Sequence, residues 1–234
     1  QFGREERPVQ EFWMYLKHMV IDRDDTSLWV KTVVVPAAGM GTRFLPATKT
    51  VPKELLPVVD TPGIELIAEE AAAVGADRLA IVTAPNKQEV MRHFEAFPDL
   101  VETLESRGKL SQSDKVKRAH SLLHPIAVEQ EKPLGLGHAV GLAESVLTDE
   151  EEFFGVMLPD DIVLPNNAME QMVAVRNKLG GSVLLAVEVP REQTFNYGVF
   201  DIEATEEDSV KKVVGMVEKP DPADAPSNLV ATGR

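Results

Sequence analysis

The sequence predicts an α/β protein with a doubly wound, mostly parallel sheet and a small antiparallel element. Short apolar runs rich in β-branched residues alternate with helix-length segments from residue 31 to residue 189. Strands separated by helices of this length form right-handed βαβ units, which make neighbouring strands parallel. Two later apolar runs, at 200–202 and 210–216, are expected to form an antiparallel pair.

The expected elements follow this alternation in order. The first strand is Val33–Val35, and it leads into a glycine-bearing loop at 36–53. The next segment, Ile64–Val74, has apolar residues on one helical face and stops at Gly75. Further strands are expected at 78–83, 126–130, 153–158 and 183–189, and further helices at 86–94, 99–107, 109–123, 135–147 and 168–179.

Local signals refine the helix starts and one turn. Asn86 with Glu89, and Asp99 with Glu102, have the spacing of a capping box at the beginning of a helix. The acidic run at 148–152 is interpreted as a solvated turn, because charge runs usually form solvated faces.

Residues 1–30 differ from the rest of the chain and are interpreted as an N-terminal extension of unknown role. They hold both tryptophans of the chain among scattered charges. Within them, Glu11–Ile21 is expected either to form a short amphipathic helix or to be poorly ordered. Residues 31–234 are expected to form one domain, which finishes in a proline-rich polar segment at 220–234.

The composition is that of a globular protein with an acidic charge balance. Of its 234 residues, 44% are hydrophobic and 26% are charged, and the formal net charge is -14. This balance argues against general nucleic-acid binding and against adhesion to an anionic membrane. No apolar run reaches the roughly 20 residues needed to span a bilayer. The absence of cysteine excludes thiolate metal sites and a cysteine nucleophile, and it suits a cytoplasmic protein.

The loop after the first strand is a basic segment in this acidic chain. No Asp or Glu occurs from residue 31 to residue 53, whereas Arg43, Lys49 and Lys53 are spaced along it. Glycines at 39 and 41 let the backbone approach a ligand, and backbone N–H groups there could hold phosphate oxygens. A glycine-bearing turn alone would often be only a strand connection, but the added cations favour phosphate. The loop matches neither a Walker A motif nor a dinucleotide fingerprint.

These residues resemble a known family. Pro36–Pro57 (PAAGMGTRFLPATKTVPKELLP) resembles the signature of the bacterial UTP–glucose-1-phosphate uridylyltransferases, which belong to the sugar-phosphate nucleotidyltransferases. The resemblance continues through Gln130–Ala139, Leu158–Asp161, Tyr197-Gly198 and Val217–Pro220. It implies a Rossmann-like fold of the nucleotide-diphospho-sugar transferase type.

The resemblance implies a nucleotide site on the first loop. Ala38 and Gly39 would lie against the nucleotide, and Arg43 and Lys53 would contact its phosphates. A glutamine amide both donates and accepts, which suits the imide edge of uracil. The other implied nucleotide-binding residues are Glu54, which would line the pocket, and Gln130 and Gly135, which would contact the base. Without the resemblance, Gln130 would be interpreted as an exposed polar residue at a strand end.

A metal site is implied at the end of the strand expected over 153–158. Asp160 matches the family's magnesium ligand, and a carboxylate just after a buried strand lies at the edge where ligands collect. Mg²⁺ commonly takes one or two carboxylates together with substrate phosphates and waters. Asp161 is the alternative ligand, but the pleat of a continuing strand would point its side chain elsewhere.

The sugar-phosphate side is implied by residues near the end of the chain. Glu218 would accept hydrogen bonds from hexose hydroxyls, Lys219 would hold the sugar's phosphate, and Gly198 would let a hydroxyl reach the backbone. Taken alone, the Glu-Lys-Pro sequence would be a solvated strand end. The catalytic group implied by the resemblance therefore comprises Arg43, Lys53, Asp160 and Lys219.

The implied reaction converts UTP and glucose 1-phosphate to UDP-glucose and pyrophosphate with Mg²⁺ as cofactor. One alternative is a sibling transferase that uses dTTP or another sugar phosphate. Another is a non-catalytic fragment that binds nucleotide sugars, because the family usually continues beyond the position of Arg234. A dinucleotide-dependent oxidoreductase shares only the fold class. The expected partners are small molecules rather than nucleic acid or membrane, and a homo-oligomer is compatible with the resemblance.

Overall fold

The computed structural model describes residues 12–15, 30–85, 87–164 and 168–234. The described residues divide into two compact units. The first, here called the parallel-sheet unit, lies within Trp29–Met169 and includes Gly233–Arg234. The second, here called the barrel unit, lies within Gln1–Leu28 and Glu170–Thr232. Residues 31–234 were expected to form one domain, and the contacts within them are concentrated in these two units.

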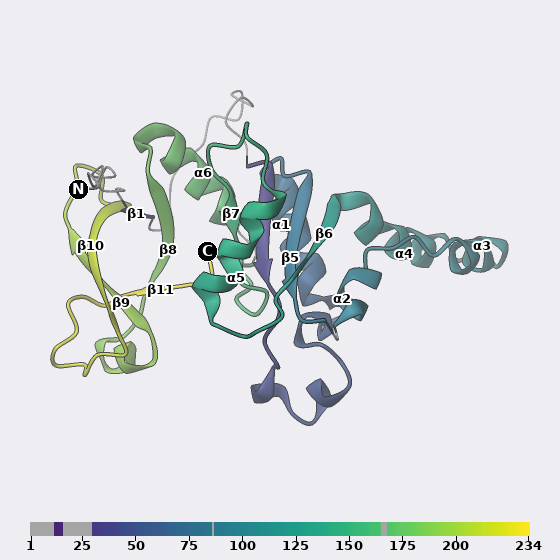
Figure 1. Cartoon of the computed structure of the whole chain (residues 1–234), viewed down its shortest axis with the longest axis horizontal. Helices are drawn as coiled ribbons and strands as arrows, with labels where there is room; N and C mark the ends of the chain where they lie inside the picture. Colours follow the sequence, from purple (N-terminus) through teal and green to yellow (C-terminus); the bar gives the residue numbers. More distant parts are fainter. Residues whose placement is uncertain (1–11, 16–29, 86, 165–167) are drawn as a thin grey trace, which may run out of the picture. The chain divides into compact units, whose positions relative to one another are not determined.

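A four-stranded parallel sheet forms the centre of the parallel-sheet unit (Figure 1). The chain builds it outward from β2 to β5 and β6 and then returns to place β7 on the free side of β2. The sheet order is therefore β6-β5-β2-β7, and the direction of winding reverses between β2 and β7. The strands are β2 (Thr32–Pro36), β5 (Arg78–Thr83), β6 (His124–Glu129) and β7 (Gly155–Val156). The predicted doubly wound sheet is confirmed.

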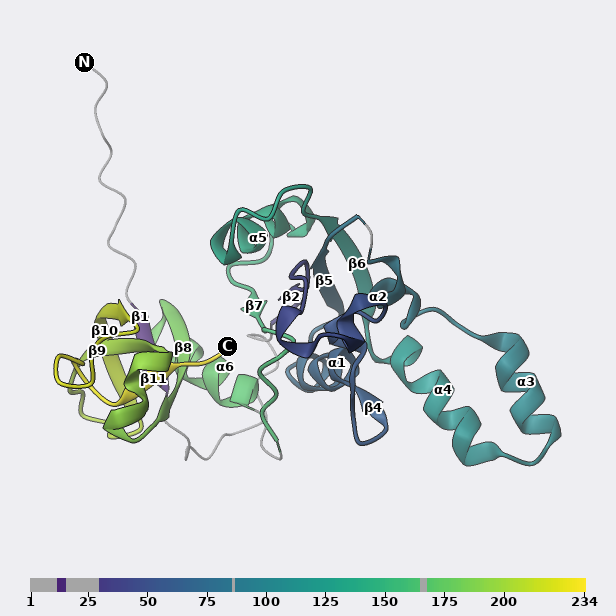
Figure 2. The ribbon, with the colours of Figure 1, turned by 90° about the horizontal axis from the view of Figure 1, so that it is seen from below.

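Helices cover both faces of this sheet, as the reversal of winding requires. Figure 2 shows α1 (Gly63–Ala73) and α5 (Leu136–Leu142) on opposite sides of the strands. The side chains of α5 and of the following 3-10 helix η5 (Ala143–Val146) pack on Val34 and its neighbours in β5 and β6. The expected inward face of the first helix, from Ile64 to Val74, is buried throughout.

Three further helices follow β5, and they begin differently from the prediction. They are α2 (Gln88–Arg92), α3 (Pro98–Ser106) and α4 (Leu110–Leu122), of which α3 and α4 form a projecting hairpin (Figure 2). The capping box expected at Asp99 does not form, because the helix begins at Pro98 and Phe97 holds the cap position. Proline suits the first helical position, where no N–H is needed. Asn86 lies outside the described residues.

Two other expectations in this unit are corrected. β7 is shorter than the strand expected over 153–158, because its ladder to β2 joins only Val33 with Gly155 and Val34 with Val156. The turn at 148–152 is not fully solvated, since the Glu151 side chain is only 1% exposed and forms an ion pair with Arg78. A partly buried arginine in β5 thus pairs with a carboxylate of a turn that has only an acidic signal in the sequence.

The barrel unit is a closed five-stranded sheet of order β1-β10-β9-β11-β8. The predicted antiparallel pair is confirmed as β9 with β10, and Phe200 of β9 lies in the unit's core. Two strands were not predicted. Phe12–Tyr15 forms β1, where Glu11–Ile21 was expected to be a short helix or poorly ordered, and β11 lies in the segment expected to be polar. The rest of Glu11–Ile21 lies outside the described residues. The elements are β1 (Phe12–Tyr15), α6 (Ala168–Leu179), β8 (Ser182–Glu188), η6 (Arg191–Asn196), β9 (Gly198–Glu203), β10 (Val210–Glu218) and β11 (Leu229–Ala231).

Candidate active site

The glycine-bearing loop leaves the carboxyl end of β2 and folds into three short 3-10 helices, η2 (Thr42–Phe44), η3 (Ala47–Lys49) and η4 (Lys53–Leu55). Gly41 is required where it stands: its φ is 65°, and a Cβ there would meet Lys53 Cβ at 3.1 Å and Thr48 Cγ2 at 3.1 Å. The Thr48 hydroxyl also donates to the Gly41 carbonyl at 2.7 Å. The loop is therefore folded back on itself, with Lys53 packed against its glycine turn.

The structure brings two predicted cations of this loop to the predicted metal-ligating carboxylate. Asp160 follows β7, the strand beside β2, so the carboxyl ends of the two strands share one sheet edge at the winding reversal. Lys53 Nζ lies 2.8 Å from Asp160 Oδ2, and Arg43 Nη2 lies 3.2 Å from the same oxygen. The Arg43 side chain is otherwise exposed to solvent, at 85%, whereas that of Lys53 is 14% exposed.

The electrostatics of Asp160 reflect this contact. Burial alone would raise the pKa of its carboxyl group, but the hydrogen bond and charge of Lys53, together with the Arg43 charge, outweigh burial. The pKa of Asp160 is therefore held below its ordinary value of 3.8, and the group is an anion at neutral pH.

Asp161, the alternative ligand, has a different environment. Its Oδ2 accepts a hydrogen bond from the backbone N–H of Gly233 at 2.5 Å. A Cβ at Gly233 would lie 2.7 Å from Asp161 Cβ, so the two segments pack closely. The Asp161 carboxylate is thus engaged by the returning chain, whereas Asp160 faces the loop cations. This geometry favours Asp160 over Asp161 as a metal ligand.

A pocket of about 730 Å³ lies against the glycine-bearing loop. Ala38, Gly39 and Gln130 line it together, although they come from the connections after two different strands. The Gln130 side-chain amide nitrogen lies 3.4 Å from the Gly135 carbonyl oxygen and 2.9 Å from His138 Nδ1. Ala38, Gly39 and Gln130 thus line one pocket, and Gly135 lies beside Gln130.

Glu54 is placed differently from the other predicted nucleotide residues. Its side chain is completely buried, and both carboxylate oxygens contact Lys87 Nζ, at 3.1 and 3.3 Å. Lys87 also lines the pocket, and the sequence analysis did not single it out. One signal could have found it: a lysine in the connection after the second parallel strand, at the ligand-binding edge of the sheet.

The predicted sugar-side residues lie together within the barrel unit. Gly198 begins β9 and pairs with Glu218 at the end of β10. A Cβ at Gly198 would meet Glu218 Oε2 at 3.1 Å, so glycine leaves room for that carboxylate. Lys219 Nζ lies 3.5 Å from Glu218 Oε1, and the Lys219 backbone N–H donates to the Tyr197 carbonyl at 2.9 Å.

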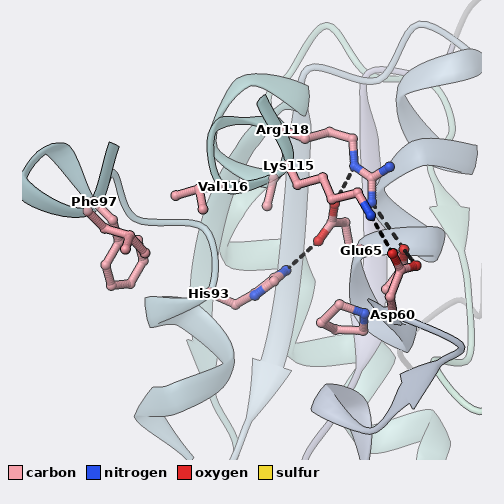
Figure 3. A pocket seen from close by; sticks show the side chains of 11 residues that line it. Asp60, Glu65, His93, Phe97, Lys115, Val116 and Arg118 are labelled. Carbon is pink, nitrogen blue, oxygen red and sulfur yellow. Dashed lines mark hydrogen bonds and ion pairs between the residues drawn. The ribbon is translucent and has the colours of Figure 1, made fainter. Parts of the chain in front are cut away.

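A second pocket, of about 420 Å³, lies between α1, α4 and the turn before β4 (Thr61–Pro62), which pairs with β3 (Pro57–Val58). Figure 3 shows that its charged side chains are directed at one another. Glu65 accepts from Arg118 Nε at 2.6 Å and lies 2.8 Å from His93 Nε2, while Lys115 Nζ lies 2.6 Å from Asp60 Oδ2. These charges hold the base of the helical hairpin to α1.

Among the described residues, no group of three His, Cys, Asp or Glu side chains could hold a metal ion. In the same part of the chain, none of the helices is both long enough and apolar enough to cross a membrane.

A cationic glycine-bearing loop that faces a carboxylate at the winding reversal of a doubly wound sheet is typical of nucleotide-binding proteins. The family model described as Nucleotidyl transferase matches residues 32–234, and the chain belongs to this family. The chain is 42% identical over 206 residues to a UTP–glucose-1-phosphate uridylyltransferase of Bacillus subtilis, covering 88% of this chain and 70% of the relative. A protein of the same description from Staphylococcus epidermidis has the same identity and coverage.

Solved structures agree with this relationship. A UTP-bound UGPase from Acinetobacter baumannii superposes with a TM-score of 0.80 at 35% identity, covering 87% of this chain and 73% of that chain. A UDP-glucose pyrophosphorylase complexed with UDP-glucose superposes with a TM-score of 0.74 at 37% identity, covering 88% and 75%. The fold class inferred from the sequence is therefore that of solved nucleotidyltransferases.

Proposed function

We propose that the protein is a UTP–glucose-1-phosphate uridylyltransferase, which converts UTP and α-D-glucose 1-phosphate to UDP-glucose and pyrophosphate. The observation that carries this proposal is the convergence of Lys53 and Arg43 on Asp160 at the winding reversal of the sheet. The curated relatives of this description, 42% identical over 206 residues, support the choice of substrates.

In this proposal the loop and its pocket hold UTP. Ala38 and Gly39 approach the nucleotide through their backbone, and Arg43 and Lys53 contact phosphate oxygens. Gln130 and Gly135, which are hydrogen-bonded neighbours at the pocket, contact the uracil base. Glu54 contributes to the same pocket indirectly, through its ion pair with Lys87, which lines the pocket.

The barrel unit supplies the proposed sugar-phosphate residues. Glu218 accepts hydrogen bonds from hexose hydroxyls, Gly198 exposes its backbone to one hydroxyl, and Lys219 holds the phosphate. The attacking group is a phosphate oxygen that is already anionic at neutral pH, so the reaction requires no general base. Arg43, Lys53 and Lys219 therefore contribute by positioning two polyanions and stabilising charge on the transferred and departing phosphates.

We propose Mg²⁺ as the cofactor, with Asp160 as its protein ligand. Asp160 is an anion at neutral pH and lies at the sheet edge beside the loop. A single carboxylate fits Mg²⁺, which keeps several waters and commonly binds substrate phosphates as well. When bound, the ion supplies positive charge to the triphosphate.

The test is release of pyrophosphate from purified protein supplied with UTP and glucose 1-phosphate, with Mg²⁺ and then with excess chelator. We expect release only when both substrates and the metal are present. The same assay is repeated with dTTP in place of UTP and with other sugar 1-phosphates in place of glucose 1-phosphate. Faster release with one of these would indicate a related nucleotidyltransferase of different substrate specificity. Binding of UDP-glucose without release in any combination would indicate the non-catalytic alternative.

A chain without cysteine suits the reducing cytoplasm, where we propose that the enzyme acts.

A further inference from the structure

Lys87 occupies a position beneath the glycine-bearing loop that none of the proposed substrate contacts explains. It lies in the connection between β5 and α2, and its side chain is 12% exposed. Its ammonium nitrogen reaches three separate groups: the Ala37 carbonyl at 2.7 Å, the Gly39 carbonyl at 2.5 Å and the Glu54 carboxylate at 3.1 Å. The contacts join segments that are 33 to 50 residues apart in the chain.

These contacts use the full donor capacity of the lysine. An ammonium group has three N–H donors and no acceptor. With two carbonyls and one carboxylate as acceptors, Lys87 could donate to a ligand only by releasing one of these groups. Lys87 is thus unsuited to contact substrate, unlike Arg43, whose guanidinium is largely exposed.

The two carbonyls set the direction of the loop's N–H groups. In a planar trans peptide, the C=O of one residue and the N–H of the next point in opposite directions. With the carbonyls of Ala37 and Gly39 turned toward Lys87, the N–H groups of Ala38 and Met40 point away from it. Within the described part of the chain, neither N–H donates a backbone hydrogen bond. Both residues line the larger pocket, so these donors are free for an anionic ligand there.

We propose that Lys87, neutralised by the buried Glu54, is a positioning residue that orients the N–H groups of the loop for the nucleotide phosphates. Glu54 is the residue after Lys53, so the same ion pair also fixes the backbone from which Lys53 reaches Asp160. This inference deepens the proposed function and rests on it for the identity of the anion.

The experiment replaces both members of the buried pair by apolar side chains of similar length, Lys87→Met with Glu54→Met. Removing both charges leaves no unpaired buried charge, and such replacements are commonly tolerated. Lys115→Met is the matched control, because Lys115 forms an exposed ion pair with Asp60 outside the larger pocket. Backbone ¹⁵N order parameters of the proteins without UTP, UTP affinity by calorimetry, and thermal melting are measured for each.

In the double variant we expect the backbone order parameters of residues 38–41 to fall from about 0.85 to below about 0.6, and the Kd for UTP to rise at least about ten-fold, while the order parameters of β5 stay near about 0.85. The KM for glucose 1-phosphate at saturating UTP should change less than about two-fold, because the barrel-unit residues are untouched. The control variant should match the parent in every measurement.

Parental order parameters in the loop, or a parental UTP Kd in a double variant with parental melting, would overturn the inference and leave the pair only a structural role. A parent protein that binds no UTP would instead contradict the proposed function. The order parameters would still decide the role of Lys87, because they are measured on the protein without UTP.

Discussion

Lys53 Nζ donates to Asp160 Oδ2 at 2.8 Å across 107 residues of sequence. The contact joins the loop after β2 to the segment after β7, the two strands between which the winding of the sheet reverses. In the proposed reaction the two partners have separate tasks, phosphate binding and metal binding. The fold therefore places the proposed phosphate-binding cation and the proposed metal-binding carboxylate beside each other at one edge of the sheet.

Replacing Lys53 tests the phosphate role. Lys53→Ala should reduce turnover by about 10²–10³-fold, the usual effect of removing one charged group that stabilises the transition state. Its melting temperature should stay close to that of the parent, because the lost ion pair is partly solvated and is worth about 1 kcal/mol or less. Steady-state pyrophosphate release measures the turnover, and calorimetry measures the melting temperature. Turnover near the parental value, with Lys115→Met as the unaffected control, would contradict the assignment.

Replacing each aspartate in turn tests the metal assignment. Asp160→Asn should lower Mg²⁺-dependent turnover by about 10²-fold or more, since a neutral amide is a poor ligand for Mg²⁺. Asp161→Asn should retain Mg²⁺ activation and lose about 1 kcal/mol of stability, because it weakens the hydrogen bond from the Gly233 N–H. Titrating Mg²⁺ in the pyrophosphate assay separates the two variants. The opposite pattern would assign the metal to Asp161.

The lowered pKa of Asp160 predicts how the Lys53 contact responds to acid. A carboxyl group whose pKa is lower in the folded protein favours folding when it is ionised. Its contribution is therefore present above the ordinary value of 3.8 and is lost as the pH falls through the lowered pKa. The parent should melt above Asp160→Asn by a constant margin from about pH 7 to about pH 5, and the margin should shrink below pH 3.8. A margin that persists in acid would contradict this origin.

The sequence predicted the elements whose signals are local. The β-branched run at 33–35 and the apolar face of the helix over 64–74 each reveal their structure within a few residues, because periodicity and stop signals are local properties. The position of Asp160 at the ligand-binding edge followed from topology, since ligands collect at the carboxyl ends of the strands. Its contact with Lys53 was not predicted. The family resemblance added the identity of the residues at that edge.

The remaining features depend on contacts between distant segments. β1 is four residues long and exists as a strand because β8 and β10 flank it, which no local pattern encodes. Glu151 is buried because Arg78 lies beneath it, and Lys87 matters because Glu54 and two loop carbonyls surround it. Each partner looks like a surface charge in sequence, so only the fold reveals that these pairs are internal.

Glu65 is expected to contribute to the stability of the protein rather than to its turnover. Its side chain is almost fully buried beside Arg118 and His93, and it lies in the smaller pocket away from the glycine-bearing loop (Figure 3). Glu65→Leu should cost roughly 1–3 kcal/mol, because it removes the acceptor from two partly buried donors. For a chain of this size, each kcal/mol lowers the melting temperature by about 2–4 °C.

The matched control for Glu65 is Asp60→Asn, since Asp60 pairs with Lys115 where both side chains are largely exposed. That variant should melt within about 0.5 kcal/mol of the parent, because exposed ion pairs contribute little. Calorimetry of the parent, Glu65→Leu and Asp60→Asn at neutral pH measures how far each substitution lowers the melting temperature. If Glu65→Leu and Asp60→Asn had the same melting temperature, the buried Glu65 carboxylate would not stabilise the packing of the helical hairpin on α1.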